Sequence, residues 1–313
     1  MNQSPQILDV VEDKTILRYQ IPHRLTRVVR RLMKYFKTNS TLVTCIGNIG
    51  AGKSSLVKVL AYNTGMNALF ELPDEGFEDH FVHNESLSPL LATAKNTAKR
   101  TLGRYYGAIN SFIECQSKET DDNHAWKIAK ENLENAALDI QHAYLDLRKM
   151  QLQTVTSLER STCIDGSSLA DRYAFCEVLH KDMDVPYLTQ EGVRVVDERL
   201  ENEFKSLVQP GLVIFLHGPT EYLFQNIRER ARNEEKSASV VSNEDIPEGL
   251  SRLVRSLNNR YDNFVDTVRE TGWYTGPVLK VDVSKIDFIS NVKHLIAVYE
   301  GIEKLLIPED FKI

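Results

Sequence analysis

The hydrophobic pattern of the chain contains five short apolar runs rich in β-formers, each followed by a loop and a stretch with helical spacing. These runs lie at residues 42–46, 68–72, 154–158, 212–217 and 278–283. Strands separated by helices imply a parallel sheet that is covered on both faces. The pattern therefore predicts an α/β fold with a five-stranded parallel sheet flanked by helices.

Two segments interrupt this alternation. Residues 87–153 contain few prolines or glycines and have apolar residues at three- and four-residue spacing, which predicts an enlarged insertion of two or more long helices. The polar run at 117–123 is the expected break between these helices. Residues 236–248 form a second polar insertion, which we expect to be a mobile loop.

The first 40 residues form an N-terminal extension with a different character. Basic and apolar side chains interleave there at helical spacing, which predicts a basic amphipathic helix. The basic residues are Arg24, Arg27, Arg30, Arg31, Lys34 and Lys37. A packed surface helix is the favoured interpretation, because Asp9, Glu12 and Asp13 upstream are unlike a transit peptide, although a membrane-surface role is an alternative.

Composition narrows the choice of function. The chain has 313 residues, of which 42% are hydrophobic, so residues 41–313 can form one large domain. Its net charge of −6 argues against nucleic acid as a partner. The four scattered cysteines are typical of reduced thiols, and we find neither a membrane-spanning run nor a signal-peptide core. We therefore expect a cytoplasmic protein that does not bind membranes.

The most specific motif lies directly after the first predicted strand. Residues 47–54 read Gly-Asn-Ile-Gly-Ala-Gly-Lys-Ser, the pattern of a phosphate-binding loop followed by a helix. Backbone N–H groups and the helix N-terminus would bind phosphates, Lys53 would reach the β and γ phosphates, and Ser54 would offer its hydroxyl to Mg²⁺. The alternative is a glycine-rich turn that binds nothing.

Charged residues follow two other predicted strands, at the edge where ligands bind in open α/β sheets. Glu71 ends the second strand and is a candidate general base for a hydroxyl acceptor. Glu159 and Arg160 follow the run at 154–158, where Glu159 could hold Mg²⁺ and Arg160 could neutralise the transferring phosphoryl group. The alternative for this pair is a surface ion pair of little energetic weight.

An arginine-rich segment at about 228–248 is a candidate lid. Arg228, Arg230 and Arg232 alternate in sequence and cannot share one helical face, so a helix should end there and open into a loop. Arginines that close over the phosphates would exclude water and stabilise charge on the phosphoryl group. The alternative is a solvated charged helix.

Over residues 42–306 the chain resembles the deoxynucleoside kinase family, in the branch of deoxycytidine, deoxyguanosine and bacterial deoxyadenosine kinases. The resemblance depends on several motifs in the right order. They are the phosphate loop at 47–55, Leu-Glu-Arg-Ser at 158–161, Arg-Ala-Arg-Asn-Glu-Glu at 230–235, Ile-Pro at 246–247, Val-Asp-Val at 281–283 and Asp-Phe at 287–288.

The resemblance implies roles for individual residues. Glu71 would take the proton from the sugar 5′-hydroxyl, and Arg160 would position that hydroxyl. Arg230 and Arg232 would be lid arginines, and Glu235 would contact the sugar 3′-hydroxyl. The nucleotide donor would be held by Gly47, Asn48, Ile49, Gly50, Ala51, Gly52, Lys53, Ser54 and Ser55, and its base by Lys285, Ile286, Asp287 and Phe288.

The resemblance also implies how the acceptor base is read. Gln141 would contact the base, Arg148 stands seven residues further on, and Asp165 would be the carboxylate partner of Arg148. Such a pair favours purine deoxynucleosides or deoxycytidine over thymidine, because it fills the space of a thymine methyl group. Asp171 competes with Asp165 for this role, and we favour Asp165 because its spacing from the predicted third strand matches the family.

The sequence departs from the family pattern at three further positions. Leu72 separates Glu71 from Pro73, where the family usually places proline directly after the base. Asn226 stands where an arginine is expected. Lys130 stands where a tyrosine is expected, so Tyr105 or Tyr106 could substitute for it, or the sugar contact could be absent.

The sequence thus predicts ATP- and Mg²⁺-dependent phosphorylation of the 5′-hydroxyl of a deoxyribonucleoside in nucleoside salvage, by an enzyme that the family suggests is a homodimer. One alternative is a nucleoside monophosphate kinase, which would need no carboxylate base. Another is a noncatalytic nucleotide-binding subunit of the same fold.

Overall fold

The computed structural model describes residues 23–72, 88–117, 123–158, 160–230 and 246–308. Its centre is a five-stranded, all-parallel sheet in the order β2-β3-β1-β4-β5. The strands are β1 (Leu42–Gly47), β2 (Asn67–Leu69), β3 (Thr162–Asp165), β4 (Leu212–His217) and β5 (Val278–Asp282). The α/β fold with a five-stranded parallel sheet is therefore confirmed.

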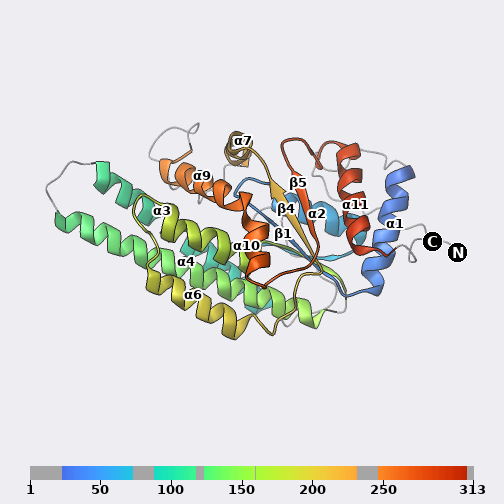
Figure 1. Cartoon of the computed structure of the whole chain (residues 1–313), viewed down its shortest axis with the longest axis horizontal. Coiled ribbons are helices and arrows are strands. Elements are labelled where there is room, and N and C mark those ends of the chain that lie inside the picture. Colours follow the sequence, from blue (N-terminus) through green and yellow to red (C-terminus); the bar gives the residue numbers. More distant parts are fainter. Residues whose placement is uncertain (1–22, 73–87, 118–122, 159, 231–245, 309–313) are drawn as a thin grey trace.

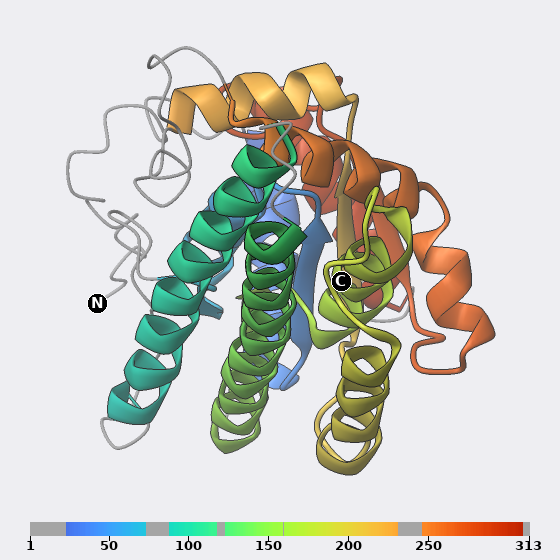
Figure 2. The same cartoon turned by 90° about the vertical axis from the view of Figure 1, so that its left-hand side faces the viewer.

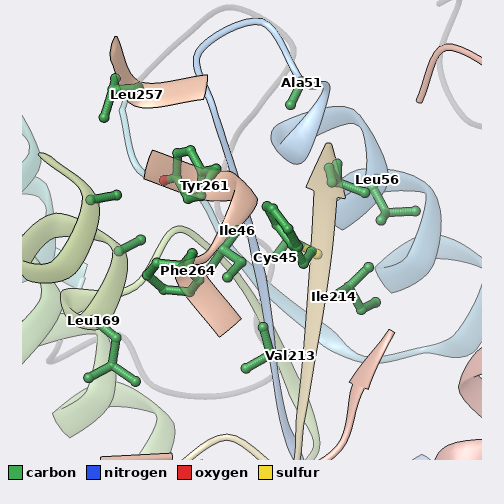
Figure 3. Close-up of a cluster of buried hydrophobic side chains, with 14 of the residues drawn as sticks. Cys45, Ile46, Ala51, Leu56, Leu169, Val213, Ile214, Leu257, Tyr261 and Phe264 are labelled. Carbon is green, nitrogen blue, oxygen red and sulfur yellow. The ribbon is translucent and has the colours of Figure 1, made fainter. Parts of the chain in front are cut away.

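Helices cover both faces of this sheet (Figure 1). On one side lie α2 (Lys53–Thr64) and α11 (Val292–Leu306), with α1 (His23–Thr38) packed outside them. On the other side lie α9 (Glu248–Asp262) and α10 (Phe264–Glu270), whose Tyr261 and Phe264 pack on Phe215 of β4. Figure 3 shows this core, with Leu56 of α2 on the opposite side of the strands.

The remaining helices build the part of the molecule that extends away from the sheet. The helices α3 (Ser88–Ser117) and α4 (Asn123–Ser157) form a long hairpin, alongside which α6 (Gln190–Glu203) packs (Figures 1 and 2). Between β3 and α6 the chain continues through the short helix α5 (Ser168–Ala170) and the π-helical turns η1 (Asp171–Cys176) and η2 (Val178–Asp182). The helix α7 (Thr220–Arg230) follows β4.

The predicted helical insertion at 87–153 is confirmed, and its break at 117–123 coincides with the end of α3 and the start of α4. The third strand predicted at 154–158 is wrong, because α4 continues to Ser157. Thr154 and Thr156 donate their hydroxyls to the carbonyls four residues earlier, at 2.7 and 2.9 Å. These bonds satisfy the hydroxyls inside a helix, so β-branched residues that favour strands are tolerated here.

The basic N-terminal helix is packed, as expected. Val28, Val29, Leu32 and Phe36 of α1 are buried in the same core as the sheet. Arg31 donates to Glu303 of α11 at 2.7 Å. Within the described residues, no helix is both long and apolar enough to cross a membrane.

Candidate active site

The phosphate loop lies between the carboxyl end of β1 and the start of α2, next to the point where the strand order reverses. From β1 the chain goes to β2 at one edge and returns to β3 beside β1, and it then continues to β4 and β5 on the other side of β1. Ligands bind at such switch points in open α/β sheets. Gly50 has a φ of +81°, and a Cβ there would lie 2.6 Å from the carbonyl oxygen of Leu223, so the turn requires glycine.

Two asparagines hold this loop in place. Asn48 donates its side-chain amide to the carbonyl of Val254 at 2.8 Å, and its own Oδ1 accepts the N–H of Ile49 at 2.7 Å. Asn226 of α7 donates to the carbonyl of Gly50 at 2.8 Å. Asn226 was noted in the sequence only as a departure from the family pattern, and the structure shows that it supports the loop.

A cavity of about 720 Å³ opens beside the loop. It is lined by the loop residues other than Asn48, and by Glu71, Gln141, Arg148, Asp165 and Asp171. Lys53 also lines it and donates to the carbonyls of Gly47 and Asn48 at 3.1 and 3.2 Å. The structure therefore brings a phosphate loop, its lysine and three carboxylates into one cavity.

Ser54 and Asp165 meet at the start of α2. The hydroxyl of Ser54 donates to Oδ2 of Asp165 at 2.5 Å, while the buried Oδ1 of Asp165 has no hydrogen-bond partner among the described residues. Burial raises the pKa of Asp165, and the ammonium of Lys53 opposes that rise. A hydroxyl and an unsatisfied carboxylate oxygen are the ligand types that Mg²⁺ takes beside nucleotide phosphates, so the pair fits this ion.

Glu71 lies two residues beyond β2 and forms an ion pair with Arg148 of α4. Arg148 Nη2 is 2.7 Å from Glu71 Oε2, and Arg148 Nε is 2.9 Å from Oδ2 of Asp171. Burial raises the pKa of Glu71, but Arg148 and Lys53 outweigh that effect and lower it to about 2. Glu71 is thus a carboxylate at neutral pH, and the hydroxyl of Tyr144 donates to it.

The aspartate whose carboxylate pairs with Arg148 is Asp171, so the preference for Asp165 in that role is wrong. Arg148 contacts only the main-chain oxygen of Asp165, at 2.8 Å from Nη1. The spacing that favours Asp165 is measured from a strand at 154–158. The third strand is instead β3 (Thr162–Asp165), and Asp165 itself ends it. Burial raises the pKa of Asp171 despite the nearby guanidinium.

Arg160 does not reach the cavity. It is exposed and precedes β3, whose Thr162 pairs with Leu42 at the amino end of β1, the edge opposite the phosphate loop. The neighbouring Ser161 accepts the N–H of Thr41 at 3.0 Å, at the same edge. The expectation that Arg160 faces the phosphates is therefore wrong. Glu159 lies outside the described residues.

The other end of the cavity is lined by α3 and α4. Gln141 is buried there and accepts the thiol of Cys176 at 3.0 Å. Tyr105 and Tyr106 also line the cavity, and the buried hydroxyl of Tyr105 has no partner among the described side chains. Lys130 instead pairs with Glu134 one turn further along α4. Tyr105 and Tyr106 therefore lie in the cavity, whereas Lys130 does not line it.

A tight loop after β5 closes the cavity beside the phosphate loop. Ile286, Asp287 and Phe288 line the cavity, and the ring of Phe288 is 3.5 Å from where a Cβ on Gly52 would lie. Asp287 Oδ1 accepts the N–H groups of Ile289 and Ser290 at 3.1 and 2.8 Å. Lys285 pairs with Asp282 at 2.7 Å. The loop therefore has a fixed shape.

The lid prediction falls largely outside the described residues. The helix α7 ends at Arg230, whose side chain is not described, and Arg232 and Glu235 lie in the segment 231–245. The chain is described again from Ile246, and α9 begins at Glu248 directly after Pro247. The Ile-Pro motif at 246–247 therefore directly precedes α9.

The chain is similar to known proteins over most of its length. The deoxynucleoside kinase family model matches residues 43–307. A deoxyguanosine kinase of Lactobacillus johnsonii is 24% identical over 212 residues, which cover 66% of this chain and 84% of the relative.

Solved structures of deoxyadenosine kinase from M. mycoides share the fold. The structure with the products dCMP and a flexible dCDP has a TM-score of 0.51 at 18% identity, covering 84% of this chain and 98% of that one. The structure with bound dATP has a TM-score of 0.52 at 17% identity, with coverages of 84% and 99%.

The family match extends from the first strand into the last helix, and it includes the phosphate loop and the cavity beside it. The chain thus belongs to the deoxynucleoside kinase family and is a nucleotide-binding kinase, a transferase that phosphorylates a hydroxyl group.

Proposed function

We propose that this kinase transfers the γ-phosphoryl group of ATP to the 5′-hydroxyl of a deoxyribonucleoside. The observation that carries the proposal is the placement of Glu71, an ionised carboxylate, in the same cavity as the phosphate loop. A hydroxyl acceptor must lose a proton as the phosphoryl group arrives, and a positioned carboxylate can accept it.

The charges of the cavity argue against a nucleoside monophosphate as acceptor. Glu71, Asp165 and Asp171 all line the cavity, and a phosphate group in contact with Glu71 would be repelled by like charge. A monophosphate acceptor also needs no carboxylate base, because its oxygen is already ionised. A neutral nucleoside avoids the repulsion and uses the base.

Each remaining part of the cavity has a role in this proposal. The phosphates of ATP would lie against the loop N–H groups and Lys53. Ser54 and Asp165 would hold Mg²⁺, which supplies positive charge beside the phosphates when it is bound. Ile286, Asp287 and Phe288 would hold the adenine, while Arg230 and Arg232 would close over the phosphates and Glu235 would bind the sugar 3′-hydroxyl.

The acceptor base would lie against Gln141, whose side-chain amide can both donate and accept a hydrogen bond. Tyr105 and Tyr106 line the same end of the cavity, where a sugar hydroxyl could meet a phenol. We propose a purine deoxynucleoside or deoxycytidine rather than thymidine, in line with the nucleosides and nucleotides named for the relatives. We further propose that the kinase is a cytoplasmic homodimer and acts in nucleoside salvage.

The test is a panel assay of purified protein with Mg²⁺ and ATP against deoxyadenosine, deoxyguanosine, deoxycytidine, thymidine and their monophosphates. We expect phosphorylation of at least one nucleoside, and a fall in kcat of about 10²- to 10⁴-fold in Glu71→Gln. Glu134→Gln, on the α3–α4 hairpin, is the matched control and should retain activity. Turnover of monophosphates alone would indicate the first alternative, and silence of a folded protein across the panel would indicate a noncatalytic subunit.

A further inference from the structure

The guanidinium of Arg148 is buried and is already hydrogen-bonded to groups of the protein, unlike that of a residue that is free to bind a ligand. Its side chain is only 2% exposed. Four of its five N–H groups are already donated within the protein, to Glu71, Asp171, the amide of Gln151 and the carbonyl of Asp165. Little of its hydrogen-bonding capacity remains for a nucleoside base.

These bonds connect α4 to the chain around Glu71 at two points. Arg148 binds the carboxylate of Glu71 directly. Gln151, one turn further along α4, accepts from Arg148 at 3.0 Å and donates to the carbonyl of Phe70 at 3.1 Å. Because Phe70 directly precedes Glu71, both the backbone and the side chain at this point are held by α4.

Gly166 provides the space that the guanidinium occupies. A Cβ on Gly166 would lie 2.1 Å from Nη2 of Arg148 and 2.6 Å from its Cζ. Gly166 cannot easily move aside, because its N–H donates to the carbonyl of Cys45 in β1 at 2.8 Å. Any other side chain at position 166 would therefore displace Arg148.

We propose that Arg148 is a positioning residue for the general base Glu71 rather than a reader of the nucleoside base, and that Gly166 is required because the guanidinium fills its side-chain space. The inference rests on the proposed function, since it assigns a support to the base of that reaction.

The surroundings of Glu71 make its protonation sensitive to this arrangement. Charged and titratable groups face it from every packed element: Lys53 of α2, Tyr144 and Arg148 of α4, Asp165 of β3, Asp171 of η1 and Tyr261 of α9. Burial raises the pKa of Glu71, and Arg148 is the strongest group that lowers it. Displacing the guanidinium should therefore raise the pKa of Glu71.

The experiment compares Gly166→Ala with Gly65→Ala and Arg148→Lys, using the nucleoside accepted by the wild type. Gly65 has a similar left-handed φ of +73°, and a Cβ there would meet no atom of the described chain within 4 Å, so it controls for backbone strain alone. We expect Gly166→Ala and Arg148→Lys to lower kcat by about 10²-fold, because they misplace the base. The KM for the nucleoside should change by less than about twofold.

Two further measurements distinguish a role of Arg148 in positioning Glu71 from a purely structural role and from recognition of the nucleoside base. The acid limb of kcat/KM should move to higher pH in Gly166→Ala and Arg148→Lys but not in Gly65→Ala. The double variant should be no worse than Arg148→Lys by more than about twofold, because both changes remove one interaction. The ratio of kcat/KM among the nucleosides should stay constant.

Any of three results would overturn the positioning role while the proposed function stands. They are a tenfold change in that nucleoside ratio, additive losses of kcat in the double variant, or the same kinetics and pH profile in Gly166→Ala and Gly65→Ala. If the folded wild type phosphorylates none of the nucleosides or monophosphates, both the positioning role and the proposed function are overturned. If Gly166→Ala does not fold, Arg148→Lys decides the question alone, through its pH profile and its nucleoside ratio.

Discussion

Asp165 illustrates how a carboxylate can be assigned one role from sequence and a different one from structure. Its spacing suggested base recognition beside Arg148, but its Oδ2 accepts from Ser54 at 2.5 Å and its Oδ1 is buried without a partner among the described residues. An unpaired buried carboxylate oxygen is costly unless a ligand satisfies it. At the scale of the residue, the structure therefore favours an Mg²⁺ role for Asp165.

We predict that Asp165→Asn raises the Mg²⁺ concentration needed for half-maximal activity by at least about tenfold, because an amide is a weaker ligand for this ion. The KM for the nucleoside should change little. The measurement is a titration of activity with Mg²⁺ at fixed ATP and nucleoside, with Asp146→Asn on the exposed side of α4 as control. An unchanged Mg²⁺ requirement together with a raised nucleoside KM would return Asp165 to base recognition.

The order of elements could be predicted from the sequence with one error, and that error explains most of the misplaced site residues. The apolar runs around β1, β2, β4 and β5 were recognised because buried parallel strands leave continuous hydrophobic runs. The end of α4 resembles a strand in composition, but it is helical to Ser157, and Thr154 and Thr156 donate their hydroxyls back to their own helix. Which segment becomes the third strand depends on tertiary contacts that the local sequence pattern does not encode.

The same argument separates the site residues that sequence could find from those it could not. The phosphate loop is a contiguous motif and Glu71 lies two residues beyond a strand that the apolar pattern located, so both could be placed from sequence. The pairing of Arg148 with Asp171, and the space at Gly166, arise where α4, η1 and β3 meet in three dimensions. Asn226 was visible only as a missing arginine, since its bond to Gly50 joins residues 176 positions apart.

The corrected position of β3 predicts that Arg160→Ala retains kcat/KM within about twofold, because an exposed side chain at the far edge of the sheet touches no reacting group. Lys53→Ala, measured in the same steady-state assay, should lose activity by orders of magnitude through the loss of charge at the phosphates. A loss of more than about tenfold in Arg160→Ala would show that this arginine reaches the phosphoryl group and that the assigned edge is not where it acts.

For the molecule as a whole, the cavity divides into a donor part and an acceptor part built from different regions of the chain. Phe288, after β5, lies over the phosphate loop, whereas Gln141 lies on α4 in the helical hairpin that extends from the sheet.

We predict that Phe288→Ala raises the KM for ATP and leaves the nucleoside KM within about twofold, because the change removes apolar contact area from the donor part only. Gln141→Ala should do the opposite, since it removes a buried hydrogen-bonding group from the acceptor part. Initial rates measured over a grid of both substrates give the two KM values for each variant and for the double variant, in which the effects should add if the parts are independent. A shift of the nucleoside KM in Phe288→Ala would instead mean that the loop after β5 contacts the acceptor, and the donor would then have to bind elsewhere in the same cavity.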